Sequence, residues 1–122
     1  MTIQDSMAEQ LRRGEAQTFF EDEFRTPLDY ATASSILCRF VESEPTGILH
    51  VGGRERMSRF ELARRSAFLL GLDPDLIRAN RQSDMAFAEQ RPADVSLDTT
   101  RLAVLFPDLR RPSIEEVRLG WE

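Results

Sequence analysis

The sequence predicts a single small mixed α/β domain in which short strands alternate with about four to five helices. Three observations support this fold class. Apolar residues recur at helical spacing in several separate stretches, short β-branched runs lie between them, and Gly or Pro residues mark the boundaries. The chain has 122 residues, with no linker or internal repeat, which suits one core built without metals or disulfides. We therefore expect one domain over residues 1–122.

The composition argues against several classes of function. A formal net charge of -5 and a pI near 5.0 disfavour nucleic acid or an anionic membrane as the main partner. Every basic residue is an arginine, a side chain suited to bidentate contacts with phosphate or carboxylate groups. The only cysteine, Cys38, rules out an internal disulfide and a cysteine cluster for zinc. The sequence has no run of about 20 apolar residues and no signal-peptide pattern at its start, so we expect a cytoplasmic protein.

The first third of the chain predicts two helices and a strand. Residues 1–13 have apolar positions near helical spacing and precede a glycine, so we expect a first helix there. Residues 17–20 are typical of a strand, and residues 22–27 form a polar turn that ends in a proline. From about residue 30 a second helix is expected, closed by the sequence Pro-Thr-Gly. Its apolar face consists of Ala33, Ile36, Leu37, Phe40 and Val41.

Residues 47–71 predict a strand, a glycine turn and an amphipathic helix, and the rest of the chain is expected to pack around this unit. Residues 47–53 are a short apolar run closed by two glycines, which is typical of a buried strand. Ser58 and Glu61 have the spacing of a capping box, so a helix should begin there and stop near Gly71.

The last third predicts shorter elements. Residues 74–77 should form a helical turn after an aspartate cap, and residues 78–95 are expected to be a long exposed loop with room for one strand. Asp98 is placed as the cap of another helix, which a proline ends. A second capping-box pattern predicts a last helix over residues 113–121.

Most motifs that would carry chemistry are incomplete. Gly52 and Gly53 follow the predicted strand, but a dinucleotide loop needs a third glycine, so a tight turn is the simpler interpretation. His50 is the only histidine and has no second histidine as a metal co-ligand; we expect it in the core rather than as a catalytic base. Cys38 lies in an apolar pattern and is expected to be a small core residue rather than a nucleophile.

Charged residues near two prolines are the remaining candidates. Asp22, Glu23 and Asp29 could form an acid and base pair, although solvated carboxylates are the ordinary interpretation. Arg25 and Arg91 each stand near a proline, where a stiff backbone can hold a guanidinium group against a diphosphate. Alternatively, each arginine caps a helix or pairs with a carboxylate such as Asp29 or Asp94.

The order of four blocks resembles a known family. The blocks are residues 22–27, 47–53, 58–63 and 91–98, and their spacing is similar to the C-terminal substrate-binding region of dTDP-4-dehydrorhamnose reductases, which are extended short-chain dehydrogenases. The resemblance runs from about Gly14 to Leu119. It implies the fold of that region and a nucleotide sugar as ligand.

The resemblance also implies that the catalytic half of such enzymes is not in these residues. In the family, an N-terminal Rossmann domain carries the glycine-rich NAD(P) loop and a Tyr-x-x-x-Lys pair. The only tyrosine here, Tyr30, has Ser34 at the lysine position, and Ala31-Thr32 replaces an acidic residue that the family tends to carry. We therefore expect no catalytic residue, no metal and no cofactor in this chain, although full-length relatives use NADPH or NADH.

Three hypotheses follow. The first is a sugar-nucleotide-binding domain with Arg25 and Arg91 as anion contacts. The alternative is a non-catalytic regulatory or structural module that assembles as a homodimer or with a Rossmann-containing chain, because loss of the Rossmann half uncovers apolar surface. A third is an enzyme that uses Asp22 or Asp29 with His50.

Overall fold

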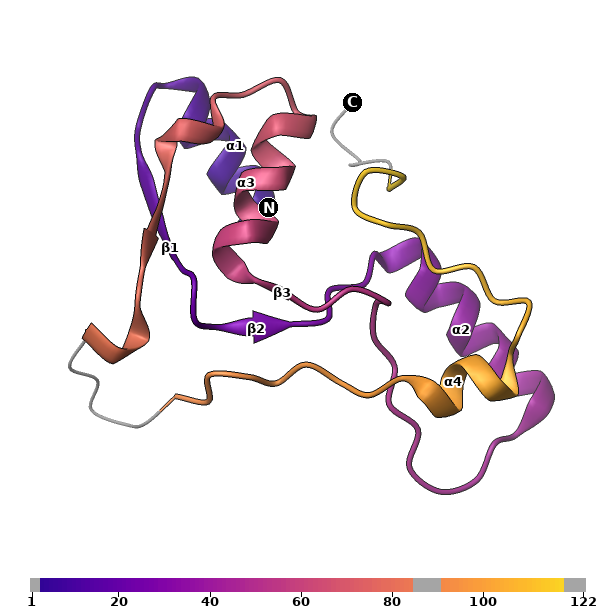
Figure 1. Ribbon diagram of the computed structural model, residues 1–122. Helices are drawn as coiled ribbons and strands as arrows, with labels where there is room; N and C mark the ends of the chain where they lie inside the picture. Colours follow the sequence, from indigo (N-terminus) through magenta and orange to yellow (C-terminus); the bar gives the residue numbers. More distant parts are fainter. Residues whose placement is uncertain (1–2, 85–90, 118–122) are drawn as a thin grey trace.

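The computed structural model describes residues 3–84 and 91–117, and it has two helical regions on either side of a short β-ribbon (Figure 1). The ribbon is made by β2 (Phe24–Arg25) and β3 (Met57–Ser58), which pair antiparallel. The structure confirms a small mixed α/β fold, with four α-helices among the described residues. Each helical region has its own apolar core.

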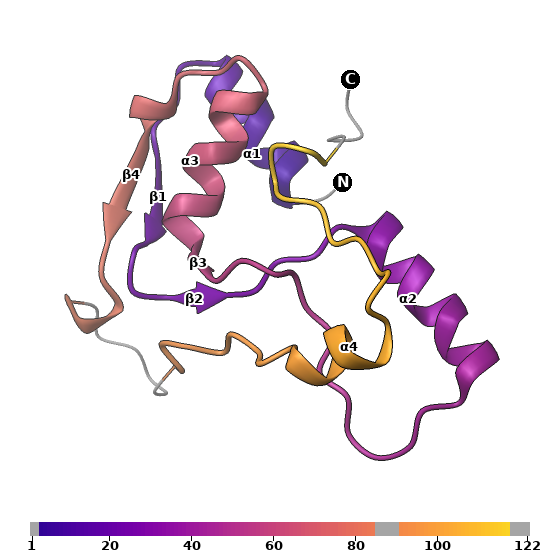
Figure 2. The same ribbon diagram turned by 45° about the vertical axis from the view of Figure 1, so that its right-hand side comes forward.

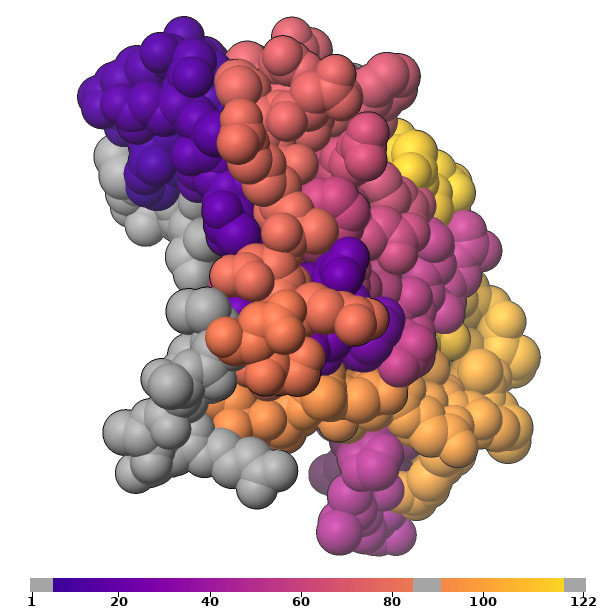
Figure 3. All heavy atoms as spheres, turned by 60° about the vertical axis from the view of Figure 1, so that its left-hand side comes forward, coloured from indigo at the N-terminus to yellow at the C-terminus, as the bar shows by residue number. Residues whose placement is uncertain are grey.

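The first region contains α1 (Ile3–Arg12), β1 (Gln17–Phe20), α3 (Arg59–Leu69) and β4 (Ile77–Asn80). β1 and β4 pair in parallel and in register along their whole length, and Figure 3 shows them side by side on one face. The first helix and the first strand are thus as predicted. The sequence also predicts room for one strand in the loop over residues 78–95, and β4 is that strand, at the start of the loop. The buried side chains of this core are Met7, Leu11, Ala63, Ala67 and Ile77.

The start of α3 confirms its sequence signals. The Ser58 side chain accepts a hydrogen bond from the Glu61 N–H at 3.1 Å, which satisfies one of the free donors of the first turn. At the other end Gly71 has φ +71°, the left-handed conformation that favours glycine after a helix. The next residues form a 3₁₀ turn, η1 (Pro74–Leu76), also as predicted.

The second region is built from α2 (Tyr30–Ser43) and α4 (Thr100–Leu105), which are shown together in Figures 1 and 2. Ile36 of α2 and Leu102 of α4 are fully buried and pack with Phe106. The rings of Phe40 and Phe106 stack with centroids 5.9 Å apart. The structure places Thr99 rather than Asp98 at the helix cap; Asp98 instead accepts a hydrogen bond from the Thr100 N–H at 2.9 Å.

The predicted strand over residues 47–53 is wrong. This segment is extended, with Leu49 and Val51 against the second core and Ile48 82% exposed, so its side chains alternate as a strand's do. No strand among the described residues pairs with it, so no backbone ladder forms along it. Two related expectations also fail, because His50 and Cys38 are both exposed rather than buried.

Gly52 and Gly53 have a role that the sequence did not indicate: they let two segments pass very close to each other. The Gly53 N–H donates to the Thr26 carbonyl at 3.1 Å. A Cβ at Gly53 would lie 1.9 Å from the Pro27 carbonyl oxygen, and one at Gly52 would lie 2.7 Å from the Thr26 hydroxyl oxygen. Only glycine permits this approach, which fixes the residues just after β2.

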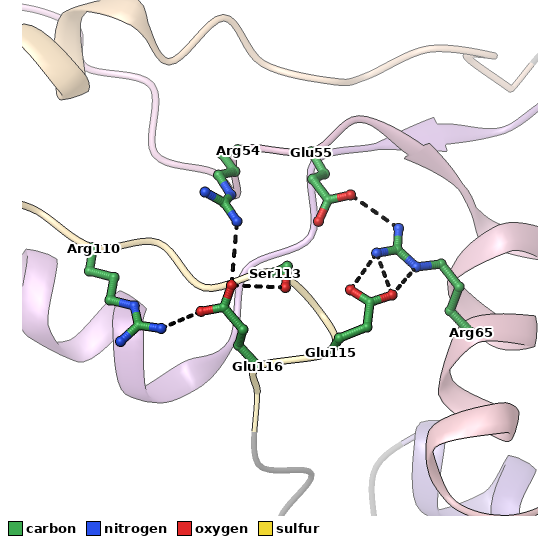
Figure 4. A network of polar contacts seen from close by, with 7 residues as sticks. All are labelled: Arg54, Glu55, Arg65, Arg110, Ser113, Glu115 and Glu116. Carbon is green, nitrogen blue, oxygen red and sulfur yellow. Dashed lines mark hydrogen bonds and ion pairs between the residues drawn. The ribbon is translucent and has the colours of Figure 1, made fainter.

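The C-terminal segment, residues 110–117, runs back between the two helical regions (Figure 2) and is held by ion pairs (Figure 4). Arg65 of α3 donates two hydrogen bonds to Glu115, at 2.8 and 2.7 Å, and a third to Glu55 at 3.1 Å. The hydrogen bonds from Arg65 lower the pKa of Glu115. The other members of this network are Arg54, Arg110, Ser113 and Glu116.

The predicted last helix is only a turn at residues 114–116, and the rest of it, residues 118–121, lies outside the described residues. Part of the predicted loop, residues 85–90, lies outside them as well. Just before that gap the chain forms a 3₁₀ turn, η2 (Gln82–Asp84). In the part of the chain that is described, no helix has the length and apolar character needed to span a bilayer.

Candidate functional site

A third extended segment lies along the ribbon and brings residue 91 toward it. The Phe24 N–H donates to the Ala93 carbonyl at 2.7 Å, and the Val95 N–H donates to the Phe24 carbonyl at 3.2 Å. The Arg56 guanidinium lies 3.8 Å from the centre of the Phe24 ring and donates to Asp94 at 2.9 Å. Both edges of β2 are therefore occupied, and side chains from three separate segments converge beside it.

Glu23, just before β2, is the centre of this convergence. Its side chain is fully buried, and one of its oxygens, Oε1, has three arginine neighbours. Arg25 Nη2 donates to this oxygen at 2.6 Å and Arg91 Nη2 at 3.3 Å, while Arg59 Nη1 lies 3.6 Å away as an ion pair. The backbone contributes too, since the Arg59 N–H donates to the Glu23 carbonyl at 3.0 Å. We call Glu23 and these three arginines the arginine cluster.

The cluster carries more positive than negative charge. Among the four side chains of the cluster alone, three guanidinium groups and one carboxylate carry a formal charge of plus two. The side chains of Arg25, Arg59 and Arg91 are 34, 38 and 40% exposed, so each is partly accessible to solvent while it contacts the buried Glu23 carboxylate. An arrangement of this kind favours binding of an anion, and planar guanidinium groups suit phosphate.

A hollow of about 400 Å³ adjoins the cluster. Arg25 and Arg59 lie on its wall, and the remaining lining is mostly apolar. The Thr26 hydroxyl oxygen accepts a hydrogen bond from the Leu97 N–H at 3.3 Å, which ties two sides of the hollow together. Charged groups on one wall and apolar groups on the others suit a ligand that has an anionic part and a ring part. The remaining lining residues are Pro27, Leu62, Val95 and Leu97.

The structure brings the two predicted arginines, Arg25 and Arg91, to one carboxylate. The alternative that they pair with a carboxylate is correct in kind, but their common partner is Glu23 and not Asp29 or Asp94. The sequence predicts Glu23 only as a carboxylate of a solvated turn, whereas the structure buries it. A sequence offers little signal for its burial, because the residue becomes enclosed only when the segments around residues 59 and 91 pack over it.

Arg59 is the member of the cluster that sequence reasoning missed. It is the first residue of α3, directly after the cap Ser58, and its side chain extends back toward the turn before β2. The signal that could have found it is the capping box, since the residue after a cap projects from the helix start. What the sequence could not give is the pairing of β3 with β2, which places that helix start beside Glu23.

The other candidate carboxylates have structural partners. Asp29 caps α2 by accepting a hydrogen bond from the Thr32 N–H at 3.0 Å. Asp94 accepts hydrogen bonds from Ser96 and from Arg56, which together lower its pKa from 3.8 to about 2. Both carboxylates thus hold local structure rather than face the hollow.

The third hypothesis, an acid–base pair with His50, finds no support in the geometry. Asp22 accepts hydrogen bonds from the backbone of Gln82 at 2.8 Å and Ser83 at 3.4 Å, and the bond from Gln82 is the main cause of its lowered pKa. Within the described residues no hydrogen bond or ion pair joins His50 to Asp22 or Asp29. Nor does any group of three or more His, Cys, Asp or Glu residues in that part of the chain have the geometry to hold a metal ion.

Solved structures of several sugar-nucleotide enzymes share this fold. The chain superposes on dTDP-4-dehydrorhamnose reductase from Bacillus anthracis, crystallised with NADP, with a TM-score of 0.80 and 18% identity. A reductase ortholog from Clostridium acetobutylicum gives a TM-score of 0.78 at 15% identity. A hypothetical dTDP-4-dehydrorhamnose reductase from Sulfolobus tokodaii gives 0.71 at 28% identity. At these identities the likeness concerns the fold.

The likeness covers most of this chain but less than half of the other proteins. It spans 95, 91 and 86% of the chain for the Bacillus, Clostridium and Sulfolobus proteins, and 41, 39 and 37% of those proteins. The chain therefore spans about two fifths of the length of these reductases. A comparison with curated proteins found no match. The family described as RmlD substrate binding domain matches residues 2–118, nearly the whole chain, and the protein belongs to that family.

Proposed function

We propose that the protein binds a nucleotide sugar of the dTDP-sugar type through the arginine cluster and the adjoining hollow. The observation that carries this proposal is the convergence of Arg25, Arg59 and Arg91 beside a hollow of about 400 Å³. Ligand pockets are typically about 300–1,000 Å³ and mostly apolar with a few placed polar groups, which agrees with this lining. The diphosphate would lie against the guanidinium groups, and the apolar wall would contact a ring of the ligand.

Catalysis is assigned to none of these residues. The relatives include a reductase that binds NADP, but the present chain spans about two fifths of such a protein and contains neither a glycine-rich dinucleotide loop nor a Tyr-x-x-x-Lys pair. The hydride-transfer machinery would have to come from outside these residues. We assign the binding of the nucleotide sugar to this chain. We also propose a cytoplasmic location, because a single free cysteine is typical of proteins in a reducing compartment.

A double variant, Arg25→Ala with Arg91→Ala, tests the proposal. Hydrogen bonds to charged groups contribute about 1.5–3 kcal/mol each, so each lost arginine should weaken nucleotide-sugar binding by roughly 10- to 100-fold. Isothermal titration calorimetry with a dTDP-sugar measures the change. The control is Arg64→Ala, which removes an exposed arginine of α3 that pairs with Asp75 away from the cluster.

The control should bind as the unmodified protein does. Both substitutions of the double variant remove an arginine from the buried Glu23 carboxylate. Circular dichroism must therefore first establish that the double variant is folded. Equal affinity of a folded double variant and the unmodified protein would refute the assignment of these residues.

A second candidate function, an interaction module, is favoured by an uncovered apolar face. On α2 the side chains of Tyr30, Leu37 and Val41 are all exposed, and their spacing of seven and four residues puts them on one side of the helix. Ile48 of the unpaired extended segment is exposed as well. Exposed apolar groups that share a helix face favour association, so we propose a homodimer or a complex with a Rossmann-containing chain.

Sedimentation velocity over a range of concentrations tests the second function. Association that is lost in a Leu37→Glu, Val41→Glu variant, and kept in the Arg25→Ala, Arg91→Ala variant, would support it. A monodisperse monomer at every concentration, together with no complex with a Rossmann-containing chain, would count against it. The two functions can coexist, since the arginine cluster and the α2 face involve different side chains.

A further inference from the structure

The arginine cluster is already occupied by one negative charge of the protein itself. Glu23 Oε1 receives all three arginine contacts, and Oε2 is buried with no hydrogen-bond partner among the described residues. Burial of a charged group is costly unless it is paired and hydrogen-bonded. Here Oε1 alone makes the ion pairs and hydrogen bonds, and it lies where the three guanidinium groups meet.

Without that carboxylate, the cluster would be three positive charges held close together. Arg25, Arg59 and Arg91 come from β2, from the start of α3 and from the segment after residue 90, so their repulsion would push apart three segments of the fold. Like charges at such distances destabilise the state that holds them together. An anion of any origin, from the protein or from solution, relieves this repulsion.

We propose that Glu23 is the resident counter-ion of the arginine cluster. It keeps the three arginines assembled when no ligand is bound, and Arg25 and Arg59, which both line the hollow, still share this one carboxylate and can contact the phosphate groups of a ligand there. Glu23 is thus a positioning residue that acts through the arginines. The inference rests on the proposed function for the nature of the ligand, a diphosphate group, but not for the charge balance itself.

Substitution of Glu23 by Gln separates charge from shape. Glutamine has nearly the same size and keeps a carbonyl oxygen that can accept the bond from Arg25, and the backbone bond between the Glu23 carbonyl and the Arg59 N–H is unaffected. The negative charge is lost, and the buried Oε2, which has no hydrogen-bond partner among the described residues, becomes an amide NH2. A residue with a merely structural role would give a less stable protein whose response to anions is unchanged.

The experiment compares thermal midpoints in a low-salt chloride buffer with and without inorganic pyrophosphate. We expect Glu23→Gln to unfold at a lower temperature than the unmodified protein, and pyrophosphate to raise its midpoint by more than it raises that of the unmodified protein. Calorimetry should show pyrophosphate binding more than tenfold tighter in the variant, since one unit charge some 10 Å away at an effective dielectric constant of about 20 changes affinity by about tenfold for each charge on the anion. Sodium chloride at equal ionic strength controls for screening.

Two further variants complete the test. Glu115→Gln also removes a carboxylate from an arginine, Arg65, but outside the cluster, and it should gain no additional response to pyrophosphate. Glu23→Asp keeps the charge and should respond to pyrophosphate as the unmodified protein does. If Glu23→Gln is unfolded in chloride, pyrophosphate should restore its far-UV circular dichroism.

The inference is overturned if pyrophosphate stabilises Glu23→Gln no more than the unmodified protein, or fails to fold it. The inference is also overturned if pyrophosphate stabilises Glu115→Gln by as much as it stabilises Glu23→Gln. Failure of the proposed function would be seen differently, as absence of nucleotide-sugar binding to the unmodified protein. The two outcomes are independent, because the pyrophosphate response of the variant does not require a nucleotide or a sugar.

Discussion

Replacement of Gly53 by alanine should destabilise the protein strongly, because the added methyl group has no room. Its Cβ would lie 1.9 Å from the Pro27 carbonyl oxygen and 3.0 Å from the carbonyl carbon, so one of the two segments must move by more than 1 Å, given that ordinary contact needs about 3.4–4 Å. The movement would break the hydrogen bond from the Gly53 N–H to Thr26, worth about 1 kcal/mol. Forced displacement in a packed region costs about 1–3 kcal/mol more.

The expected loss in the free energy of unfolding is therefore about 2–4 kcal/mol. For a chain of this size that corresponds to a fall in the thermal midpoint of about 8–16 °C, measured by circular dichroism. Gly71→Ala is the control, because nothing lies within 4 Å of its added Cβ and only its φ of +71° opposes the change. Left-handed backbone costs an alanine about 1–2 kcal/mol. A Gly53 variant less affected than the Gly71 variant would refute the close approach of these two segments.

Two further predictions concern the second core and the segment beside β2. Leu102→Ala should lower the free energy of unfolding by about 2–5 kcal/mol, since Leu102 is fully buried, while Val104→Ala on the exposed side of α4 should change it little; urea denaturation measures both. The pKa of Asp94 is lowered by folding to about 2, so its carboxylate stabilises the folded state above its ordinary pKa of 3.8, and this contribution is lost as the pH falls toward 2. Asp94→Asn should therefore unfold at a lower temperature than the unmodified protein at neutral pH, and the difference should shrink as the pH falls from about 4 and vanish only below pH 2.

The elements that were predicted correctly are those with local signals. α2 and α3 form where apolar residues recur at helical spacing, and the cap at Ser58 and the glycine at residue 71 act within one turn of the helix. Such signals depend on neighbours in the sequence, so they can be recognised without knowledge of the tertiary fold. The predicted core face of α2 is only partly correct, because Ile36 and Phe40 pack in the second core whereas Leu37 and Val41 are exposed. The parallel pairing of β1 with β4 joins residues about 60 positions apart and has no comparable local signal.

The failures have a common physical cause, which is a missing neighbour. Residues 47–53 have the composition and the alternation of a strand, yet a strand needs a ladder of backbone pairs. Within the described residues only the Gly53 N–H makes a backbone hydrogen bond to another segment, at Thr26. For the same reason Ile48 and His50 are exposed. A periodic pattern shows which residues are suited to burial, and the fold determines whether anything covers them.

The sequence predicts two of the three arginines of the candidate site. Nearby prolines, which stiffen the backbone, point to Arg25 and Arg91 as candidates, and the two arginines do meet at one carboxylate. The identity of that carboxylate and the presence of Arg59 depend on three segments that the ribbon brings together, which no local pattern encodes. Charge alone also could not reveal the cluster, since the chain as a whole is acidic.

A calorimetric and thermal-shift titration of the unmodified protein with dTDP-sugars and UDP-sugars, alone and with NADPH, tests nucleotide-sugar binding most directly. A ligand that binds only the folded state stabilises it by mass action, by about 2.7 kcal/mol at a hundredfold excess over the dissociation constant. We expect saturable stabilisation by a nucleotide sugar and none by NADPH alone. The absence of any response to every nucleotide sugar would contradict the assignment of the arginine cluster as a ligand site and would leave the interaction module as the function to pursue.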